Sequence, residues 1–295
     1  MSSLEPITLN HKSGSSATIH PFGATVTSFK TAQREVLFVS SSAKLDGSKA
    51  IRGGIPLVFP QFGQPDKSYP QHGFLRCNVW KLEGTTEKED GTQCCEFSLN
   101  LKDAVAARGG KWGEDTEYDC LVTLKVKLTE DKLKTYLNIQ NKGKVPFDFQ
   151  TLFHTYYKVD GSKALDPKLC NVNGLVGYQA EDKITGDTYI VGGEPIIIDR
   201  EVDRIYQNPS KPVLDIVINA GGSSVELQAK ATVNGIETPV SVVVWNPFIE
   251  KAKGMSDFTD EQYHDMVCVE PGVLHDVPSL TEGVDAIFEQ VITAL

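Results

Sequence analysis

The sequence predicts an all-β protein, built as an antiparallel sandwich or barrel. Most of its readable pattern alternates apolar and polar residues, which is the period of a strand with one buried face. Gly, Pro, Asn and Asp separate these runs, as turns between strands require. Helical periodicity is nearly absent. Only residues 103–108, which end at a Gly-Gly pair, could form one or two helical turns.

The alternation is clearest in the middle of the chain. It predicts strands at residues 95–101, 124–128, 133–139 and 145–149, with residues 129–132 as a hairpin loop. Further strands are predicted at residues 24–30, 196–199, 224–229, 240–245, 266–270 and 284–294. No repeat of 20–50 residues is visible, which disfavours a propeller. No low-complexity linker divides the chain, so we expect a single domain over residues 1–295.

Composition excludes several classes of partner. The 295 residues carry 29 Lys+Arg against 39 Asp+Glu, and this net charge of −10 supplies no general basic field for nucleic acid. We expect no membrane partner, because no apolar run approaches the roughly 20 residues of a bilayer span. The N-terminus lacks signal-peptide features, so the six cysteines indicate reduced thiols and a cytoplasmic protein. An anionic ligand would need a few well-placed cations in this acidic chain.

Residues 52–63, RGGIPLVFPQFG, fit neither a strand nor an exposed loop. Two prolines and three glycines exclude a regular central strand, yet the segment is strongly apolar. A buried, irregular segment suits the wall of a pocket, with Arg52 at its entrance. Composition alone favours the alternative, an ordinary crossover with an exposed arginine.

Two further segments carry polar groups of chemical interest. In QHGFLR, Gln71 and His72 precede Arg76, and arginine binds phosphate through a planar fork of donors. An exposed loop is the alternative interpretation. In LFHTYY, His154 lies among aromatic residues. A histidine in such a place is more often a core residue, although imidazole can serve as an acid near neutral pH.

A fourth segment, MVCVEPG, is an apolar strand that reaches Glu270 and is expected to stop at Pro271-Gly272. If Glu270 is buried, its pKa should rise toward the range of a general base. The alternative is a surface acid at a strand end. His154 and Glu270 form a candidate acid/base pair, but sequence spacing cannot show that they meet. Metal-ligand spacings such as CxxC and HExxH are absent, so no metal site is predicted.

Six segments occur together in one order that resembles a known family: RGGIPLVFPQFG, QHGFLR, FHTYYKV, EVDRIY, VVWNPFIEKAKGMSDF and CVEPG. The set is similar to the aldose 1-epimerase (galactose mutarotase-like) superfamily and, more closely, to its glucose-6-phosphate 1-epimerases. The resemblance covers residues 43–272 and is weakest at residues 81–119. It implies a large antiparallel β-supersandwich of the galactose mutarotase-like type, which agrees with the alternation.

The resemblance also implies an isomerase that interconverts the α and β anomers of D-glucose 6-phosphate or related hexose 6-phosphates. The reaction opens and recloses the sugar ring by acid/base catalysis and uses no cofactor. By resemblance, Glu270 is the general base and His154 the general acid. The positions that bind substrate are Arg52, Gln71, Arg76 and Asp203.

The expected partner is therefore a small molecule, a hexose 6-phosphate, bound to a monomer. Arg52 and Arg76 are the expected anchors for its negative charge. Because base and acid must be in opposite protonation states, a bell-shaped pH profile is predicted. Two alternatives stay open: a mutarotase for unphosphorylated aldoses, and a non-catalytic protein that binds sugar phosphates.

Overall fold

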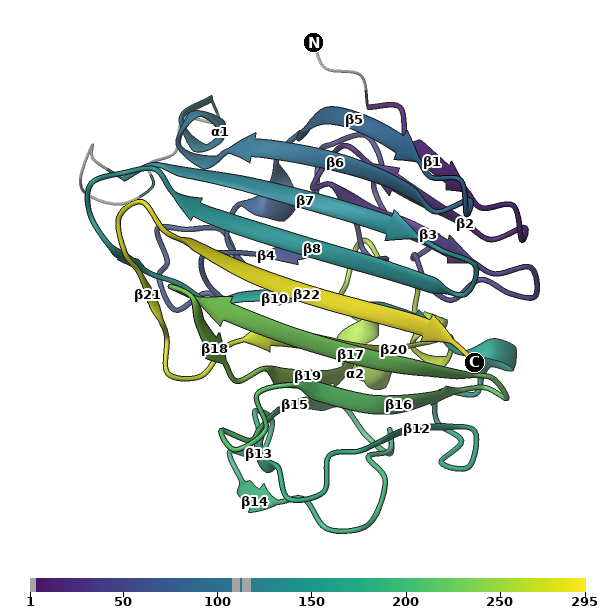
Figure 1. Ribbon diagram of the computed structural model, residues 1–295. Helices are drawn as coiled ribbons and strands as arrows, with labels where there is room; N and C mark the ends of the chain where they lie inside the picture. The colour runs from purple at the N-terminus through teal and green to yellow at the C-terminus, as the bar shows by residue number, and fades with distance from the viewer. Residues whose placement is uncertain (1–3, 108–111, 113–117) are drawn as a thin grey trace.

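The computed structural model describes residues 4–107, 112 and 118–295. Two large sheets lie face to face, and Figure 1 shows the larger sheet in front of the smaller one. Within the described residues, every pairing between strands is antiparallel. The predicted antiparallel all-β sandwich is therefore confirmed.

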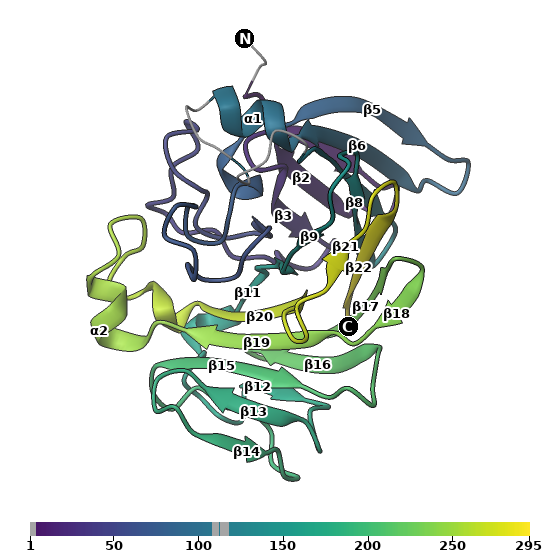
Figure 2. The ribbon, with the colours of Figure 1, turned by 90° about the vertical axis from the view of Figure 1, so that its left-hand side faces the viewer.

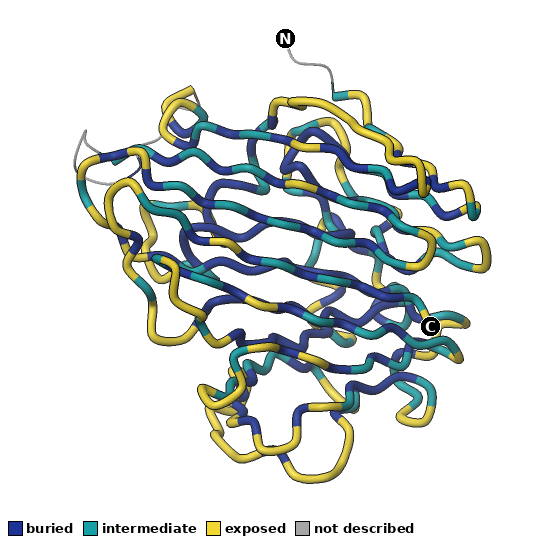
Figure 3. Tube along the Cα trace, viewed as in Figure 1, coloured by how far each residue is buried: buried dark blue, intermediate teal, exposed yellow. Residues whose placement is uncertain are grey.

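The larger sheet has one buried face. Its strands, in spatial order, are β12 (Cys170–Asn173), β16 (Leu214–Ala220), β17 (Ser224–Val233), β22 (Asp285–Ala294), β8 (Lys132–Asn141), β7 (Cys120–Leu128), β6 (Gln93–Asn100) and β5 (Lys81–Glu87), while β18 (Ile236–Thr238) pairs with β17. Buried residues alternate with partly exposed ones along the long strands, as Figure 3 shows. This is the pattern that made the strands recognisable in the sequence.

The smaller sheet carries the site. Its order is β14 (Thr188–Ile190), β13 (Gln179–Asp182), β15 (Val202–Gln207), β19 (Ser241–Asn246), β20 (Met266–Val273), β10 (Thr151–Phe153) and β4 (Leu57–Val58), while β11 (Tyr156–Lys158) pairs with β20. Two minor sheets join β1 (Ile7–Asn10), β2 (Ser16–His20) and β3 (Thr25–Lys30), and β9 (Phe147–Asp148) with β21 (Ser279–Leu280).

Helices are short and few among the described residues. The α-helices are α1 (Leu101–Ala107) and α2 (Phe248–Lys253), and the 3₁₀ turns are η1 (Leu75–Cys77), η2 (Asp160–Ser162) and η3 (Gln262–His264). The helical turn expected at residues 103–108 corresponds to α1, although residue 108 and the following glycines lie outside the described residues. No helix in the described ranges has the length and apolar character of a membrane span.

Strands β19 and β20 are buried on both faces. One face carries Val242, Val244, Val267 and Val269, which belong to the main core between the large sheets. The opposite face contributes to a second apolar cluster, whose members from these strands are Val243, Trp245, Met266 and Cys268. Figure 2 shows the loops that follow β3 lying above β19 and β20, with α2 beside them. A polar side chain on that second face therefore lies in an enclosed place.

Several details of the sequence prediction are wrong. Leu101 begins α1 instead of ending a strand, and within residues 145–149 only Phe147–Asp148 form a strand. Residues 196–199 form no regular strand, because only Ile196 makes an isolated bridge, to Val172. The strand at residue 266 does not stop at Pro271, since β20 continues to Val273. Gly272 permits this continuation: it pairs with Ser241, and an added Cβ would collide with the Cβ of Leu152 on β10.

The segment at residues 52–63 is irregular and buried, as predicted. Its regular part is limited to the two residues of β4. Gly53 and Gly54 have positive φ values and lie so close to the backbone of Phe38 and Val26 that a side chain would collide with it. The segment therefore packs closely against the backbone of residues 26 and 38, and Arg52 lies beside β11.

Candidate active site

One pocket of about 350 Å³ collects all six predicted site residues. They come from the Arg52 segment, the loop before η1, η1 itself, the β10–β11 connection, β15 and β20, and the members are Arg52, Gln71, Arg76, His154, Asp203 and Glu270. His72 also lines the pocket. The structure thus brings together residues up to 218 positions apart, as 270 minus 52 gives. Their individual catalytic and binding roles stay predictions.

Strand register explains how the acids reach the same face of the smaller sheet. Asp203 on β15 lies opposite Trp245 on β19, and Val243 lies opposite Glu270 on β20. Residues directly opposite each other, and residues two apart along a strand, share a face of the sheet. Asp203, Trp245 and Glu270 therefore project together into the pocket.

His154 and Glu270 are in contact inside the protein. The Nδ1 of His154 lies 3.3 Å from the Oε1 of Glu270, and their side chains are 8% and 1% exposed. Among the described residues, nothing forms a hydrogen bond of good geometry with His154 Nδ1 or Glu270 Oε2. Because buried polar atoms are nearly always paired, Glu270 Oε2 is an acceptor that a ligand could engage, while His154 Nδ1 faces Glu270 Oε1.

Aromatic rings fix the orientation of His154. Its ring is nearly parallel to that of Tyr156, with centroids 4.9 Å apart. Trp245 meets it edge-on at 6.1 Å, and His72 does so at 5.6 Å. The backbone N–H of His154 donates to the carbonyl oxygen of Pro56. The imidazole is therefore held in place before any ligand arrives.

Burial moves the two pKa values in opposite directions. It raises the pKa of Glu270 well above its usual value; Asp203 adds to this effect, and Arg76 and Arg52 oppose it. Burial also lowers the pKa of His154 well below its usual value, and His72, Arg76 and Arg52 lower it further. A raised pKa suits Glu270 to general-base work near neutral pH. The lowered pKa, however, favours a neutral His154, which is the wrong state for a general acid.

Four cations among the described residues line the pocket: Arg52, Arg76, Lys183 and Lys251. The two lysines carry no signal in the sequence, because there they look like ordinary solvated charges. Lys183 lies over the ring of Phe62, 5.4 Å from its centroid, and Lys251 pairs with Glu201 at 2.8 Å. The pocket is thus rich in positive charge within a chain whose net charge is −10.

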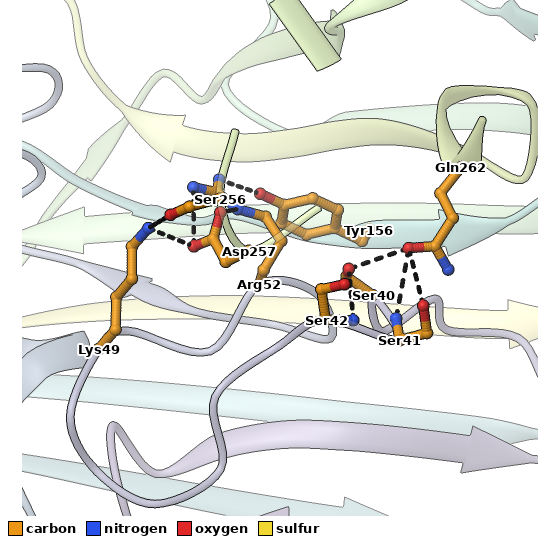
Figure 4. Close-up of polar contacts among 9 residues, drawn as sticks. All are labelled: Ser40, Ser41, Ser42, Lys49, Arg52, Tyr156, Ser256, Asp257 and Gln262. Atoms are coloured by element: carbon orange, nitrogen blue, oxygen red, sulfur yellow. Dashed lines mark hydrogen bonds and ion pairs between the residues drawn. The ribbon is translucent and has the colours of Figure 1, made fainter. Parts of the chain in front are cut away.

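The two arginines are anchored differently. Arg52 donates to both carboxylate oxygens of Asp257 and to the hydroxyl of Tyr156, as Figure 4 shows. Arg76 donates through Nη2 to the backbone carbonyl of Gln71 at 2.8 Å, while its buried Nε has no hydrogen-bond partner among the described residues. Gln71 therefore contributes at least its backbone to the site, because its carbonyl orients Arg76.

Three pocket-side groups have the chemistry of metal ligands. The ligand atoms of His154, Cys268 and Glu270 lie within 4.8 Å of one another. Such nitrogen, sulfur and oxygen donors can hold zinc. Two guanidinium groups line the adjoining pocket, however, and their charge opposes a bound cation. The expectation that the protein works without a metal stays a prediction.

The fold and the pocket define a class of protein: an antiparallel β-sandwich with a buried His–Glu contact in a pocket of small-molecule size. The sequence profile of the aldose 1-epimerase family matches residues 5–281. A Cenchrus ciliaris protein named "Putative glucose-6-phosphate 1-epimerase" is 31% identical over 287 residues, which cover 96% of this chain and 82% of that protein. The chain belongs to the aldose 1-epimerase family, and membership supports epimerase activity, the interconversion of sugar anomers.

Solved structures agree on the fold. A Salmonella typhimurium protein described as a "putative mutarotase" superposes with a TM-score of 0.81 at 24% identity, covering 100% of this chain and 91% of that one. A galactose mutarotase-like protein from Lactobacillus casei gives a TM-score of 0.67 at 16% identity, covering 99% and 100%. The predicted galactose mutarotase-like fold is therefore confirmed.

Proposed function

We propose that the protein interconverts the α and β anomers of D-glucose 6-phosphate or a closely related hexose 6-phosphate. The observation that carries the proposal is the convergence of the His154–Glu270 pair and four cations on one pocket. The name of the Cenchrus ciliaris relative points to the same substrate. All six cysteines are described and are free thiols, which suits the reducing cytoplasm, and we propose that compartment.

The reaction needs one base and one acid on the same sugar. Glu270 takes the proton of the C1 hydroxyl while protonated His154 gives a proton to the ring oxygen O5. The C1–O5 bond breaks, leaving an open-chain aldehyde, neutral His154 and protonated Glu270. Rotation about C1–C2 turns the other face of the carbonyl toward O5. The O5 hydroxyl then attacks C1, His154 takes back the O5 proton, and Glu270 returns its proton to the C1 oxygen. The ring closes as the other anomer, and both side chains regain their starting states.

Binding of the substrate phosphate can favour the protonated form of His154. Burial and the charges of His72, Arg76 and Arg52 lower the pKa of His154. A phosphate dianion bound by Arg52 and Arg76 offsets their positive charge and so raises the pKa of His154 toward the working range. An unphosphorylated aldose leaves those charges uncompensated. The site therefore suits hexose phosphates better than free aldoses.

Asp203 completes the polar lining on the side of the pocket away from β10. Burial raises its pKa, against the opposing charges of Lys251 and Lys183. Its carboxylate oxygens are suited to accept hydrogen bonds from sugar hydroxyls. We assign it the orientation of the sugar, in agreement with the sequence-based expectation.

Substrate choice tests the proposal directly. Starting from pure α anomers, polarimetry or a coupled assay should give a kcat/KM for glucose 6-phosphate on the order of 10² above that for glucose, as expected from two charge-assisted hydrogen bonds. Equal efficiency with both sugars would favour a mutarotase for unphosphorylated aldoses. Binding of the phosphate ester without turnover would favour a sugar-phosphate-binding protein.

The pH dependence provides a second test. As pH falls, protonation of Glu270 removes the base; as pH rises, deprotonation of His154 removes the acid. Because the pKa of Glu270 is raised and that of His154 is lowered, the acidic and alkaline losses of activity lie close together in pH in the free enzyme. We expect a narrow bell for kcat/KM and an alkaline limb for kcat that lies at higher pH, because bound phosphate raises the pKa of His154. Rates measured from about pH 5 to 9 check this, and limbs at the same pH in both profiles would contradict it.

A further inference from the structure

Asp257 is a buried carboxylate that the reaction described above does not use. It lies in the loop after α2, and its side chain is 2% exposed. Its Oδ1 accepts from Arg52 Nε at 3.3 Å, and its Oδ2 accepts from Arg52 Nη2 at 3.4 Å and pairs with Lys49 Nζ at 2.9 Å. Figure 4 shows the carboxylate between the two cations. Burying a carboxylate costs free energy unless it is paired, so a function is expected for this paired carboxylate.

We propose that Asp257 positions Arg52 for binding the substrate phosphate, and that Lys49 preserves the positive charge of this arrangement. The proposal rests on the function given above, because it takes the phosphate ester as the ligand of Arg52. Asp257 itself does not line the pocket, so it acts through Arg52.

The hydrogen bonds fix the plane of the guanidinium. Arg52 has five N–H donors. Two donate to Asp257 along one edge, and one donates to the hydroxyl of Tyr156 at 3.1 Å. Among the described residues the two remaining donors have no hydrogen-bond partner, and they can meet an anion in the pocket that Arg52 lines. A fork that is held in advance loses less conformational entropy on binding than a mobile arginine does.

Lys49 compensates the negative charge that Asp257 places beside Arg52. Arg52 and Asp257 alone sum to zero charge and would attract a phosphate weakly. With Lys49 the three groups carry a net charge of +1. Burial works against ionisation of Asp257, but Arg52 and Lys49 outweigh it and hold the pKa of its carboxyl below the usual value. The carboxylate therefore stays charged at neutral pH and keeps both cations in place.

The loop that carries Lys49 is itself tied down. The backbone N–H of Ser40 donates to the carbonyl oxygen of Arg52, which closes the neck of the loop. The hydroxyl of Ser40 and the backbone N–H of Ser41 donate to Gln262 on η3, a few residues after Asp257. The loop and the Asp257 segment are thus joined at two places, so the array has a defined geometry.

Titration calorimetry with inorganic phosphate separates positioning from simple charge. Asp257→Asn removes a negative charge, so a purely electrostatic role predicts tighter phosphate binding, whereas positioning predicts binding weaker by about tenfold, the size of one charge-assisted contact. Asp257→Asn combined with Lys49→Met restores the original net charge without the bidentate contact. We expect phosphate binding to stay weak in this double variant.

Lys49→Met alone should weaken phosphate binding by about threefold, while Lys49→Arg should retain it, because the partly exposed cation acts through its charge. Lys253→Met is the matched control, since Lys253 pairs with the exposed Glu250 on α2 and should have no effect. Thermal melts identify any variant that fails to fold. If Asp257→Asn does not fold, the Lys49 variants still test the arrangement of Lys49, Asp257 and Arg52.

The same variants should raise KM for glucose 6-phosphate with little change in kcat. Wild-type or tighter phosphate binding in Asp257→Asn, recovery in the double variant, or an unaffected Lys49→Met would overturn the proposal. Failure of the proposed substrate would appear differently, as equal turnover of glucose and its phosphate by the wild type. Phosphate titration needs no turnover, so the two failures are distinguishable.

Discussion

Glu270→Gln should reduce kcat for anomer interconversion by about 10³-fold, or about 4 kcal/mol in the barrier. The amide keeps the size of the side chain but cannot accept the C1 proton. The environment of Glu270 already raises its pKa because the charged form is poorly solvated at 1% exposure. A neutral amide there should leave the melting temperature unchanged or higher. Loss of rate can then be assigned to the missing base.

Glu289→Gln is the matched control for this experiment. Glu289 lies on β22 in the larger sheet, pairs with Lys230, and does not line the pocket. The same chemical change there should leave kcat within about twofold, as for surface positions generally. If Glu270→Gln kept a near-wild-type rate with the fold intact, Glu270 would not be the base.

His154→Ala should reduce kcat by about 10²–10³-fold, because the leaving ring oxygen would lose its proton donor. The substitution also opens a space beside the pocket, between the rings of Tyr156 and Trp245. Added imidazole should enter this space and restore part of the rate. Steady-state rates with increasing imidazole, at fixed pH and ionic strength, measure the effect.

His275→Ala serves as the comparison, since His275 is 49% exposed and should show neither loss nor rescue. A rate in His154→Ala close to that of the wild type would remove His154 from the mechanism. A large loss without rescue, accompanied by a fall in melting temperature, would point to a packing role for the ring instead. Rescue by imidazole separates proton transfer from packing because only the former needs a titratable nitrogen.

Local pattern was sufficient for most of the architecture. Strands such as β8 and β17 were visible because every second side chain meets the core, and this period does not depend on which strand is the neighbour. The errors arose where pairing with a neighbouring strand decides whether a segment forms a strand. Ile196 has only one bridge partner, and Gly272 continues β20 because β10 approaches it closely. Neither fact is written in the residues nearby.

The acid/base candidates were reached partly from local chemistry and mainly from the family resemblance. A glutamate at the end of an apolar strand and a histidine among aromatic residues could equally have been a surface acid and a core residue. Their contact at 3.3 Å depends on β20 lying beside the β10–β11 connection. The directions of their pKa shifts follow from burial and from four neighbouring charges, which also come from distant segments.

The sequence by itself therefore determined the all-β class, several of its long strands and, through ordered motifs, the family. Only the tertiary structure decided that the predicted residues share one pocket, that Lys183 and Lys251 belong to it, and that Asp257 holds Arg52 from 205 positions away. The physical reason is that strand periodicity is a local property of the chain. Burial, charge pairing and pKa shifts depend instead on which distant segments the fold packs together.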